Sequence, residues 1–200
     1  MLEPGAGRGW RRWLLRSFIR ALDQRLLGCA NTVDPATHRG SLGLKIDVLG
    51  LDSESLRTLE EIGKRLSDRR IVILVPHLAA FADLGSYLAT GARLKTMGFN
   101  LCLEGLCHHT LPLINRTRLG VDFLRMEWNP TLEQAAPSLE PLKRGIERAE
   151  PGRVILSGCD SAAALKFGLS LGLTLFQGRH VEHQVDSARS PTMTLRAARL

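Results

Sequence analysis

The sequence has 200 residues, of which 44% are hydrophobic and 24% charged, a balance that suits one globular domain with a sizeable core. Aromatic residues make up only 5%, which argues against a surface that binds nucleic acid by base stacking. No uninterrupted apolar run approaches the roughly 18–20 residues that a membrane-spanning helix needs.

The formal net charge of +7 is concentrated near the two ends of the chain. Before residue 26, only Glu3 and Asp23 oppose a group of arginines: Arg8, Arg11, Arg12, Arg16, Arg20 and Arg25. The C-terminal tail adds Arg189, Arg196 and Arg199. Basic ends of this kind bind nucleic acid or an anionic membrane in some proteins and are simply solvated in others. We expect disorder in the basic residues 1–9 and in the unpatterned residues 183–200.

Residues 10–28 have the periodicity of an amphipathic helix that ends near Gly28. Apolar residues recur at helical steps of three and four: Leu14, Phe18, Leu22, Leu15, Ile19 and Leu26. We expect this apolar face to pack on a sheet. The alternative is a basic amphipathic anchor on a membrane surface.

From residue 42 onward, strands and helices alternate. Six short apolar runs predict strands buried on both faces, at 42–50, 69–76, 99–105, 121–128, 153–158 and 173–178. The segments between them predict helices at 53–68 with Ser53 as N-cap, at 81–98, at 132–152 broken by prolines, and at 161–172. Residues 109–120 predict a short helical or irregular connection.

This alternation predicts an α/β fold made of parallel βαβ units. A closed (β/α) barrel usually has eight strands, so about six strands predict a partial or modified TIM-like barrel, with an additional N-terminal helix. Either the sheet is open or the barrel lacks its first two units. We assign residues 10–182 to this one domain.

The four cysteines contain no Cys-x-x-Cys pair, and Cys102 and Cys159 lie within apolar runs, as reduced and packed thiols do. The basic N-terminus lacks the small-residue cleavage site of a signal peptide. We therefore expect a reduced, cytoplasmic location.

Ligand sites in such folds lie at the carboxyl ends of the strands. The polar residues at or just beyond these ends form the candidate site: Asp47, Glu104, Arg125, Glu127, Asp160, Gln177 and Arg179. Arg125 and Arg179 have the geometry to bind phosphates bidentately. Alternatively, Arg125 forms an ion pair with Glu104 or Glu127 across neighbouring strands.

Three segments, taken in order, resemble the EAL domain of cyclic-di-GMP phosphodiesterases from its third unit to its end. They are GFNLCLEGLC (98–107), VDFLRME (121–127), and LSGCD (156–160) followed by Gln177-Gly178. The family has a strand ending in Asp-Asp-Phe-Gly, then Val-Asp-Tyr-Leu-Lys-Ile-Asp, then Ala-Glu-Gly-Val-Glu and a closing Gln-Gly. The resemblance implies a degenerate EAL domain that is truncated at its N-terminus.

The resemblance implies a hydrolase in which carboxylates and an amide at the strand ends hold two divalent cations. Here the family's Glu-Ala-Leu strand would precede residue 1, and an asparagine corresponds approximately to Asp47. A glutamate becomes Leu74, the Asp-Asp pair becomes Glu104-Gly105, the lysine becomes Arg125, and another glutamate becomes Ser157. Such a site needs many oxygen ligands. We therefore expect no catalytic residue, no metal and no cofactor; Mg²⁺ or Mn²⁺ would matter only with residual activity.

Other histidines and cysteines allow further hypotheses. Cys107, His108 and His109 follow a strand end but match no standard zinc spacing. We expect them to form an exposed loop, with the two adjacent histidine side chains diverging. His180 and His183 follow the last strand, where solvent exposure is the expected state.

These observations predict a catalytically inactive EAL-like domain that acts as a regulatory or protein-binding module in bacterial cyclic-di-GMP-type signalling. The alternatives are a non-hydrolytic cyclic-di-GMP receptor that uses Arg125 and Arg179, or a residual phosphodiesterase. Nucleic acid or an anionic membrane remains a further partner for the basic helix. A homodimer or the N-terminal helix would cover an exposed sheet edge.

Overall fold

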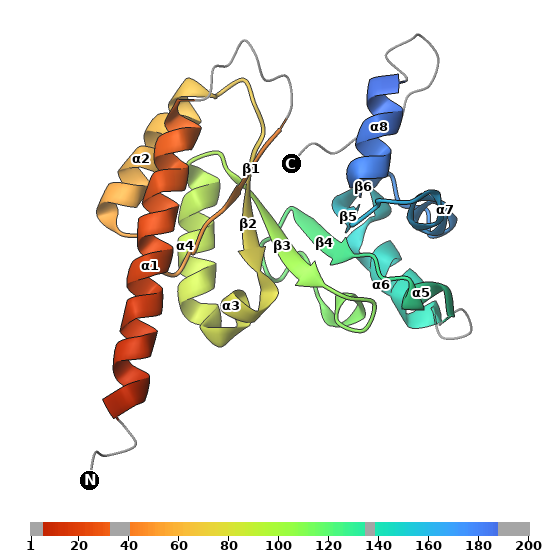
Figure 1. The fold of residues 1–200 in the computed structure, drawn as a ribbon, viewed down its shortest axis with the longest axis horizontal. Coiled ribbons are helices and arrows are strands. Elements are labelled where there is room, and N and C mark those ends of the chain that lie inside the picture. The colour runs from red at the N-terminus through yellow and green to blue at the C-terminus, as the bar shows by residue number, and fades with distance from the viewer. Residues whose placement is uncertain (1–5, 33–40, 135–138, 188–200) are drawn as a thin grey trace.

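The computed structural model describes residues 6–32, 41–134 and 139–187. In these residues, six parallel strands form one sheet in sequential order, so that each strand pairs with the next along the chain. The strands are β1 (Leu42–Lys45), β2 (Ile71–Pro76), β3 (Asn100–Leu106), β4 (Phe123–Glu127), β5 (Val154–Ser157) and β6 (Leu175–Gln177). The predicted α/β class and the partial TIM-like barrel are confirmed, because the sheet curves as half of a barrel with helices outside it (Figure 1).

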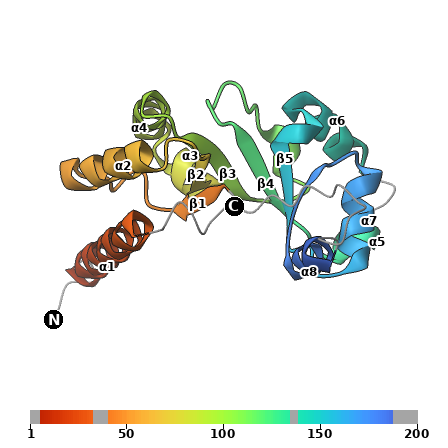
Figure 2. The same ribbon diagram turned by 90° about the horizontal axis from the view of Figure 1, so that it is seen from above.

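The helices are α1 (Ala6–Asn31), α2 (Ser53–Arg65), α3 (His77–Ala82), α4 (Leu84–Thr96), α5 (Thr131–Gln134), α6 (Glu140–Ala149), α7 (Ala162–Ser170) and α8 (Arg179–Ser187). Two 3₁₀ turns, η1 (Leu111–Leu113) and η3 (Pro151–Arg153), complete the described elements. Figure 2 shows α1, α2 and α4 beside the first three strands and α5 to α8 around the last three. None of the helices in the described segments has both the length and the apolar character needed to cross a bilayer.

The sheet has a different apolar cluster on each face, because successive side chains of a strand point to opposite sides. The larger cluster lies between the sheet and its helices and includes Leu44, Ile73, Leu103 and Leu124. The smaller one lines the inner face of the half-barrel: Val72, Leu74, Cys102, Phe123 and Ile155, with Leu175 packed against them. The inner face is therefore filled by side chains below the strand ends.

Several element boundaries differ from the predicted ones for local reasons. The first strand stops at Lys45 because the Asp47 carboxylate accepts a hydrogen bond from the Leu49 backbone and starts a turn. Asp52, rather than Ser53, caps α2 by accepting a hydrogen bond from Ser55 N.

The helix predicted at 81–98 is instead two helices. Asp83 leaves the helical conformation between α3 and α4, and its carboxylate caps α4 by accepting from Ser86 N.

The helices at the two ends of the chain include residues that we expected to be disordered. α1 begins at Ala6, inside the segment 1–9. α8 continues to Ser187, beyond residue 183, and buried Val181 attaches it to the core. The rest of both predicted tails, residues 1–5 and 188–200, lies outside the described residues.

The prediction that the apolar face of the first helix packs on the sheet is wrong for three of its members. Leu14, Phe18 and Leu22 are exposed, whereas Leu27 and Ala30, further along α1, are the residues that enter the core. Asp23 holds α1 in this orientation, because its Oδ2 accepts a hydrogen bond of 3.0 Å from Asp47 N. Burial raises the pKa of the Asp23 carboxyl, although this hydrogen bond opposes the rise.

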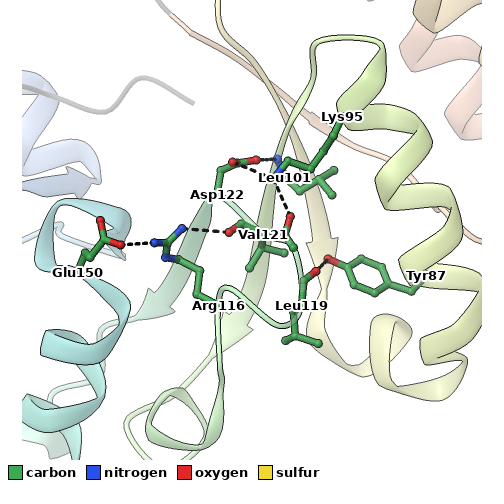
Figure 3. Close-up of polar contacts among 9 residues, drawn as sticks. Tyr87, Lys95, Leu101, Arg116, Leu119, Val121, Asp122 and Glu150 are labelled. Atoms are coloured by element: carbon green, nitrogen blue, oxygen red, sulfur yellow. Dashed lines mark hydrogen bonds and ion pairs between the residues drawn. The ribbon is translucent and has the colours of Figure 1, made fainter.

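A polar network at the amino end of β4 explains one residue of the family-like pattern, Asp122 (Figure 3). Its Oδ2 accepts from Leu101 N at 2.9 Å, and its Oδ1 lies 3.2 Å from Lys95 Nζ. Nearby, the Tyr87 hydroxyl donates to Leu119 O at 3.1 Å. Asp122 therefore joins α4 to the start of β4. It lies at the amino end of this strand, whereas the candidate site lies at the carboxyl ends of the strands.

All four cysteines are free thiols. Cys102 and Cys159 are fully buried, which confirms their prediction as packed thiols. Burial raises the pKa of Cys102 to about 12 and that of Cys159 to about 11.

Candidate functional site

A β-bulge at the end of β3 positions the central carboxylate of the candidate site, Glu104. The pairing of β3 with β4 runs through Leu103 and Leu124 and resumes at Leu106 and Met126, so that two residues of β3 face one of β4. Gly105 takes the extra place with φ +75°, a value that suits glycine. The bulge thus sets Glu104 opposite Arg125, with Glu104 only 5% exposed.

Glu104 is held between two cations, and we call this group the Lys45–Glu104–Arg125 cluster. Arg125 Nη1 donates to Glu104 Oε2 at 3.0 Å. Lys45 Nζ lies 2.6 Å from Oε1 in an ion pair. The Arg125 side chain is mostly buried, whereas the Lys45 side chain is 65% exposed. The arginine contact is therefore the one shielded from water.

Sequence reasoning missed Lys45 and His77. Lys45 is the last residue of β1, so it can reach Glu104 only because the sheet brings β1, β2 and β3 side by side. Its position two residues before Asp47 was the available signal, because alternate residues of a strand share a face. His77 begins α3, and its Nδ1 lies 3.2 Å from the backbone oxygen of Glu104.

Asp160 and Arg179 form a second polar pair at the ends of β5 and β6. Asp160 Oδ1 accepts from Arg179 N at 2.8 Å, and Oδ2 lies 3.5 Å from Arg179 Nη2. The backbone hydrogen bond from Arg179 lowers the pKa of Asp160, and its guanidinium adds to that effect. Both side chains are largely exposed, so this pair lies at the rim of the site.

Gly178 allows the close approach on which this pair depends. A Cβ atom at residue 178 would lie 2.5 Å from backbone atoms of Cys159. Cys159 N also donates to Gln177 O at 3.0 Å. Gln177 and Gly178 therefore have a structural role, which is to join the ends of β5 and β6, and this role does not depend on catalysis.

Besides Glu104 Oε1, which Lys45 contacts in an ion pair, three buried polar atoms at these strand ends have no hydrogen-bond partner: Arg125 Nε, Trp128 Nε1 and Gln177 Oε1. Buried polar atoms are normally paired, so such a group points to water or a ligand. Trp128 follows β4 directly, and its backbone N donates to Ser157 O at 2.8 Å. Sequence reasoning did not select Trp128. Its place beside the site depends on β4 ending at Glu127, and the predicted strand included Trp128 as its last residue.

Other predicted site residues are not part of the cluster. The Asp47 side chain serves the turn after β1, and its backbone bonds to α1. Glu127 is exposed at the end of β4, so the ion pair of Arg125 is with Glu104. The buried hydroxyl of Ser157 donates to Met126 O at 3.1 Å.

The histidines differ from their prediction in two respects. The rings of His108 and His109 do not diverge: their centroids are 3.7 Å apart with planes tilted by 41°. Burial, followed by the neighbouring His109, lowers the pKa of His108. On α8, His180 is half-buried rather than exposed, with its Nε2 3.1 Å from Gln184 Nε2, whereas His183 is exposed as predicted. Throughout the described segments, no group of three or more His, Cys, Asp or Glu residues is placed to hold a metal ion.

Comparison with solved structures identifies the fold of this chain. The Xanthomonas citri FimX EAL domain in complex with c-di-GMP matches with a TM-score of 0.53 and 18% identity, over 81% of this chain and 64% of that one. The PaMucR phosphodiesterase in its c-di-GMP complex matches with a TM-score of 0.53 and 12% identity, over 86% and 76%. This chain has the fold of an EAL domain.

The S helix–GGDEF–EAL segment of Vibrio cholerae LapD, in its apo form, matches the EAL-like chain with a TM-score of 0.55 and 8% identity. That match covers 79% of this chain and 40% of the LapD chain. No protein-family model matches the sequence, and no curated protein matches it either. The likeness at these identities is one of fold.

Proposed function

We propose that this EAL-like chain is a catalytically inactive module of cyclic-di-GMP-type signalling that acts by binding rather than by hydrolysis. The observation that carries the proposal is the Lys45–Glu104–Arg125 cluster. Two cationic side chains hold the one buried carboxylate among the candidate ligands, at 2.6 and 3.0 Å. A carboxylate paired in this way is a poor ligand for a divalent cation, because the cation would meet the ammonium and the guanidinium.

The donors at the neighbouring strand ends do not fit a two-metal centre either. Such a centre needs several oxygen ligands for each ion. Leu74 offers none, and the Ser157 hydroxyl is already bonded to Met126 O. Arg125 replaces a lysine in the resemblance and never acts as a proton donor near neutral pH. These substitutions together support the loss of hydrolysis.

A phosphodiesterase assay tests this directly. The full chain is incubated with cyclic-di-GMP and Mg²⁺ or Mn²⁺, with an active EAL phosphodiesterase as the positive control, and linear product is measured. We expect none above background. Glu104→Gln is the matched control, because trace turnover that survives in it comes from a contaminant. Turnover at a rate near that of the positive control would refute the proposal.

A protein partner is supported by apolar side chains around the same end of the sheet. Leu78 and Phe81 of α3, which follows β2, are 73% and 47% exposed. Leu113 of η1, in the connection after β3, is 81% exposed. Exposed apolar side chains that gather in one region are typical of protein-binding surfaces.

Capture experiments with matched variants test that surface. We expect a partner retained by the wild type to be lost with Leu78→Ser/Phe81→Ser and kept with Leu169→Ser, which alters a leucine on α7 that is 52% exposed, close to the 47% of Phe81. Light scattering on the same proteins tells a homodimer from a different partner. Equal capture by all three proteins would count against the surface.

The second candidate function is that of a cyclic-di-GMP receptor. The unpaired Arg125 Nε, Trp128 Nε1 and Gln177 Oε1 favour it, because together they offer two donors and an acceptor. The exposed guanidinium of Arg179 would add a phosphate contact. Titration calorimetry with cyclic-di-GMP decides between the candidates: a receptor binds the dinucleotide intact and loses it in Arg125→Ala, whereas a pure protein-binding module releases no heat.

A further inference from the structure

The N-terminal helix carries an apolar stripe that the domain does not cover. Leu14, Phe18 and Leu22 follow one another at intervals of four residues and are 51%, 59% and 48% exposed. Residues spaced by four lie on one side of a helix. Figure 1 shows that the amino-terminal part of α1 continues past the end of α2.

The opposite side of α1 faces the domain. Phe18 and Leu27 are nine residues apart, which is two and a half turns and places them on opposite sides of the helix. Leu27 is 2% exposed and Ala30 is 4% exposed, and Asp23 bonds to Asp47 N. Arg65 Nη2 also donates to Ala30 O at 2.8 Å. The end of α1 is thus fixed with the stripe turned outward.

We infer that α1 binds the surface of an anionic bilayer, with Leu14, Phe18 and Leu22 inserted between the lipids. Charge complementarity supports this occupant. Arg25, seven residues after Phe18 and therefore on the same side of the helix, is exposed, and the chain before residue 26 contains six arginines against Glu3 and Asp23. Basic amphipathic helices lie in the bilayer interface by combining buried apolar area with attraction to anionic headgroups.

Other occupants fit the stripe less well. A nucleic acid would use the arginines but would leave three large apolar side chains in water. A second copy of the chain would bring two arginine-rich helices together, and like charges repel. An anionic bilayer satisfies both the apolar stripe and the positive charge. The helix would lie on the membrane rather than cross it, in keeping with the lack of a spanning helix in the described segments.

Vesicle sedimentation with the full chain tests the inference. Vesicles of phosphatidylcholine with about 30% phosphatidylserine carry the negative surface charge of a cytoplasmic leaflet. We expect the wild type to sediment with these vesicles and to bind neutral phosphatidylcholine vesicles much less. Replacing all three stripe residues, Leu14→Ser/Phe18→Ser/Leu22→Ser, should weaken binding on the order of 100-fold, because three partly buried side chains are lost from the lipid.

Leu169→Ser is the matched control, because Leu169 on α7 is 52% exposed, close to the 51% of Leu14, but lies away from α1. Urea unfolding monitored by circular dichroism shows whether each variant is folded, and Phe18→Ser alone replaces the triple variant if the latter is not.

Wild-type binding that the stripe variant retains, or an absence of binding to anionic vesicles, would overturn the inference. So would a soluble dimer that the stripe variant converts to a monomer, because a second copy would then cover the stripe. These outcomes are independent of hydrolysis and of dinucleotide binding.

Discussion

Replacing Arg125 by methionine should destabilise the chain far more than the same replacement of Lys45. Both side chains contact the carboxylate of Glu104, at 3.0 and 2.6 Å, so distance alone would favour Lys45. The difference comes from solvent. Arg125 is 22% exposed and Lys45 is 65% exposed, while the Glu104 side chain is 7% exposed.

The magnitude follows from these values. At 3.0 Å the attraction between Arg125 and Glu104 is about 5.5 kcal/mol for an effective dielectric constant near 20. Desolvation of both groups offsets much of it, but Arg125→Met leaves the buried Glu104 carboxylate with only the water-screened Lys45 as a partner, which costs about 3 kcal/mol. Lys45 is screened by water, so its loss costs about 0.5–1 kcal/mol.

Urea unfolding at neutral pH measures both variants. With a slope of roughly 2–3 kcal/mol per molar urea, Arg125→Met should lower the midpoint by about 1 M or more. The double variant Glu104→Leu/Arg125→Met removes both charges and should recover most of the loss, because an apolar pair leaves no buried charge. Equal midpoints for Arg125→Met and Lys45→Met, or a double variant with additive losses, would refute the reasoning.

Three further predictions concern the framework. Gly178→Ala should lower the free energy of unfolding by about 2 kcal/mol or more in urea titrations, because its Cβ would meet the backbone of Cys159 at 2.5 Å. Gly28→Ala, in α1 with nothing within 4 Å, should instead stabilise by about 0.5 kcal/mol; equal effects would contradict the steric argument. Asp122→Ala should cost about 2 kcal/mol in the same titration, because Leu101 N loses its acceptor; a neutral effect would show that water replaces the carboxylate. The contribution of Cys102 to stability should be constant below about pH 8.5 and fall as pH rises towards 12, since its thiol has a pKa raised to about 12 and ionises more readily once unfolded; a midpoint unchanged between pH 8 and pH 11 would exclude this linkage.

The sequence was sufficient to predict the sheet, because each strand lies within a largely apolar run and the runs alternate with segments of helical periodicity. The run at 71–76, for example, is buried at every position but the last. The parallel topology then placed the polar strand ends at one edge of the sheet. It also allowed an ion pair of Arg125 with Glu104 or Glu127, and the structure has the pair with Glu104. These features depend on neighbouring strands and on local hydrophobicity, and both can be recognised in a single sequence.

The rest depends on geometry that periodicity does not carry. The pattern of α1 established an apolar stripe, but contacts distant in sequence, such as the hydrogen bond between Asp23 and Asp47 N and that between Arg65 and Ala30 O, fix which side of the helix faces the domain. Lys45 reaches Glu104 across an intervening strand, so no short-range signal connects them. The rings of His108 and His109 meet although adjacent side chains ordinarily diverge, because the turn after β3 brings them together.

The residues that carry the EAL-like pattern have structural roles that would require them with or without catalysis. Asp122 accepts a hydrogen bond from Leu101 N and binds Lys95. Position 178 accepts only glycine, because any Cβ atom there would meet the backbone of Cys159. Gly105 permits the bulge that faces Arg125. A chain under selection for the fold alone would therefore keep this pattern. The pattern thus explains the shared architecture but does not indicate whether the chain hydrolyses a substrate. Hydrolysis would depend on a different set of atoms at the strand ends. Those atoms are the ones held by Lys45 and Arg125, so the proposal of binding without hydrolysis depends on that cluster and not on the likeness of the sequence.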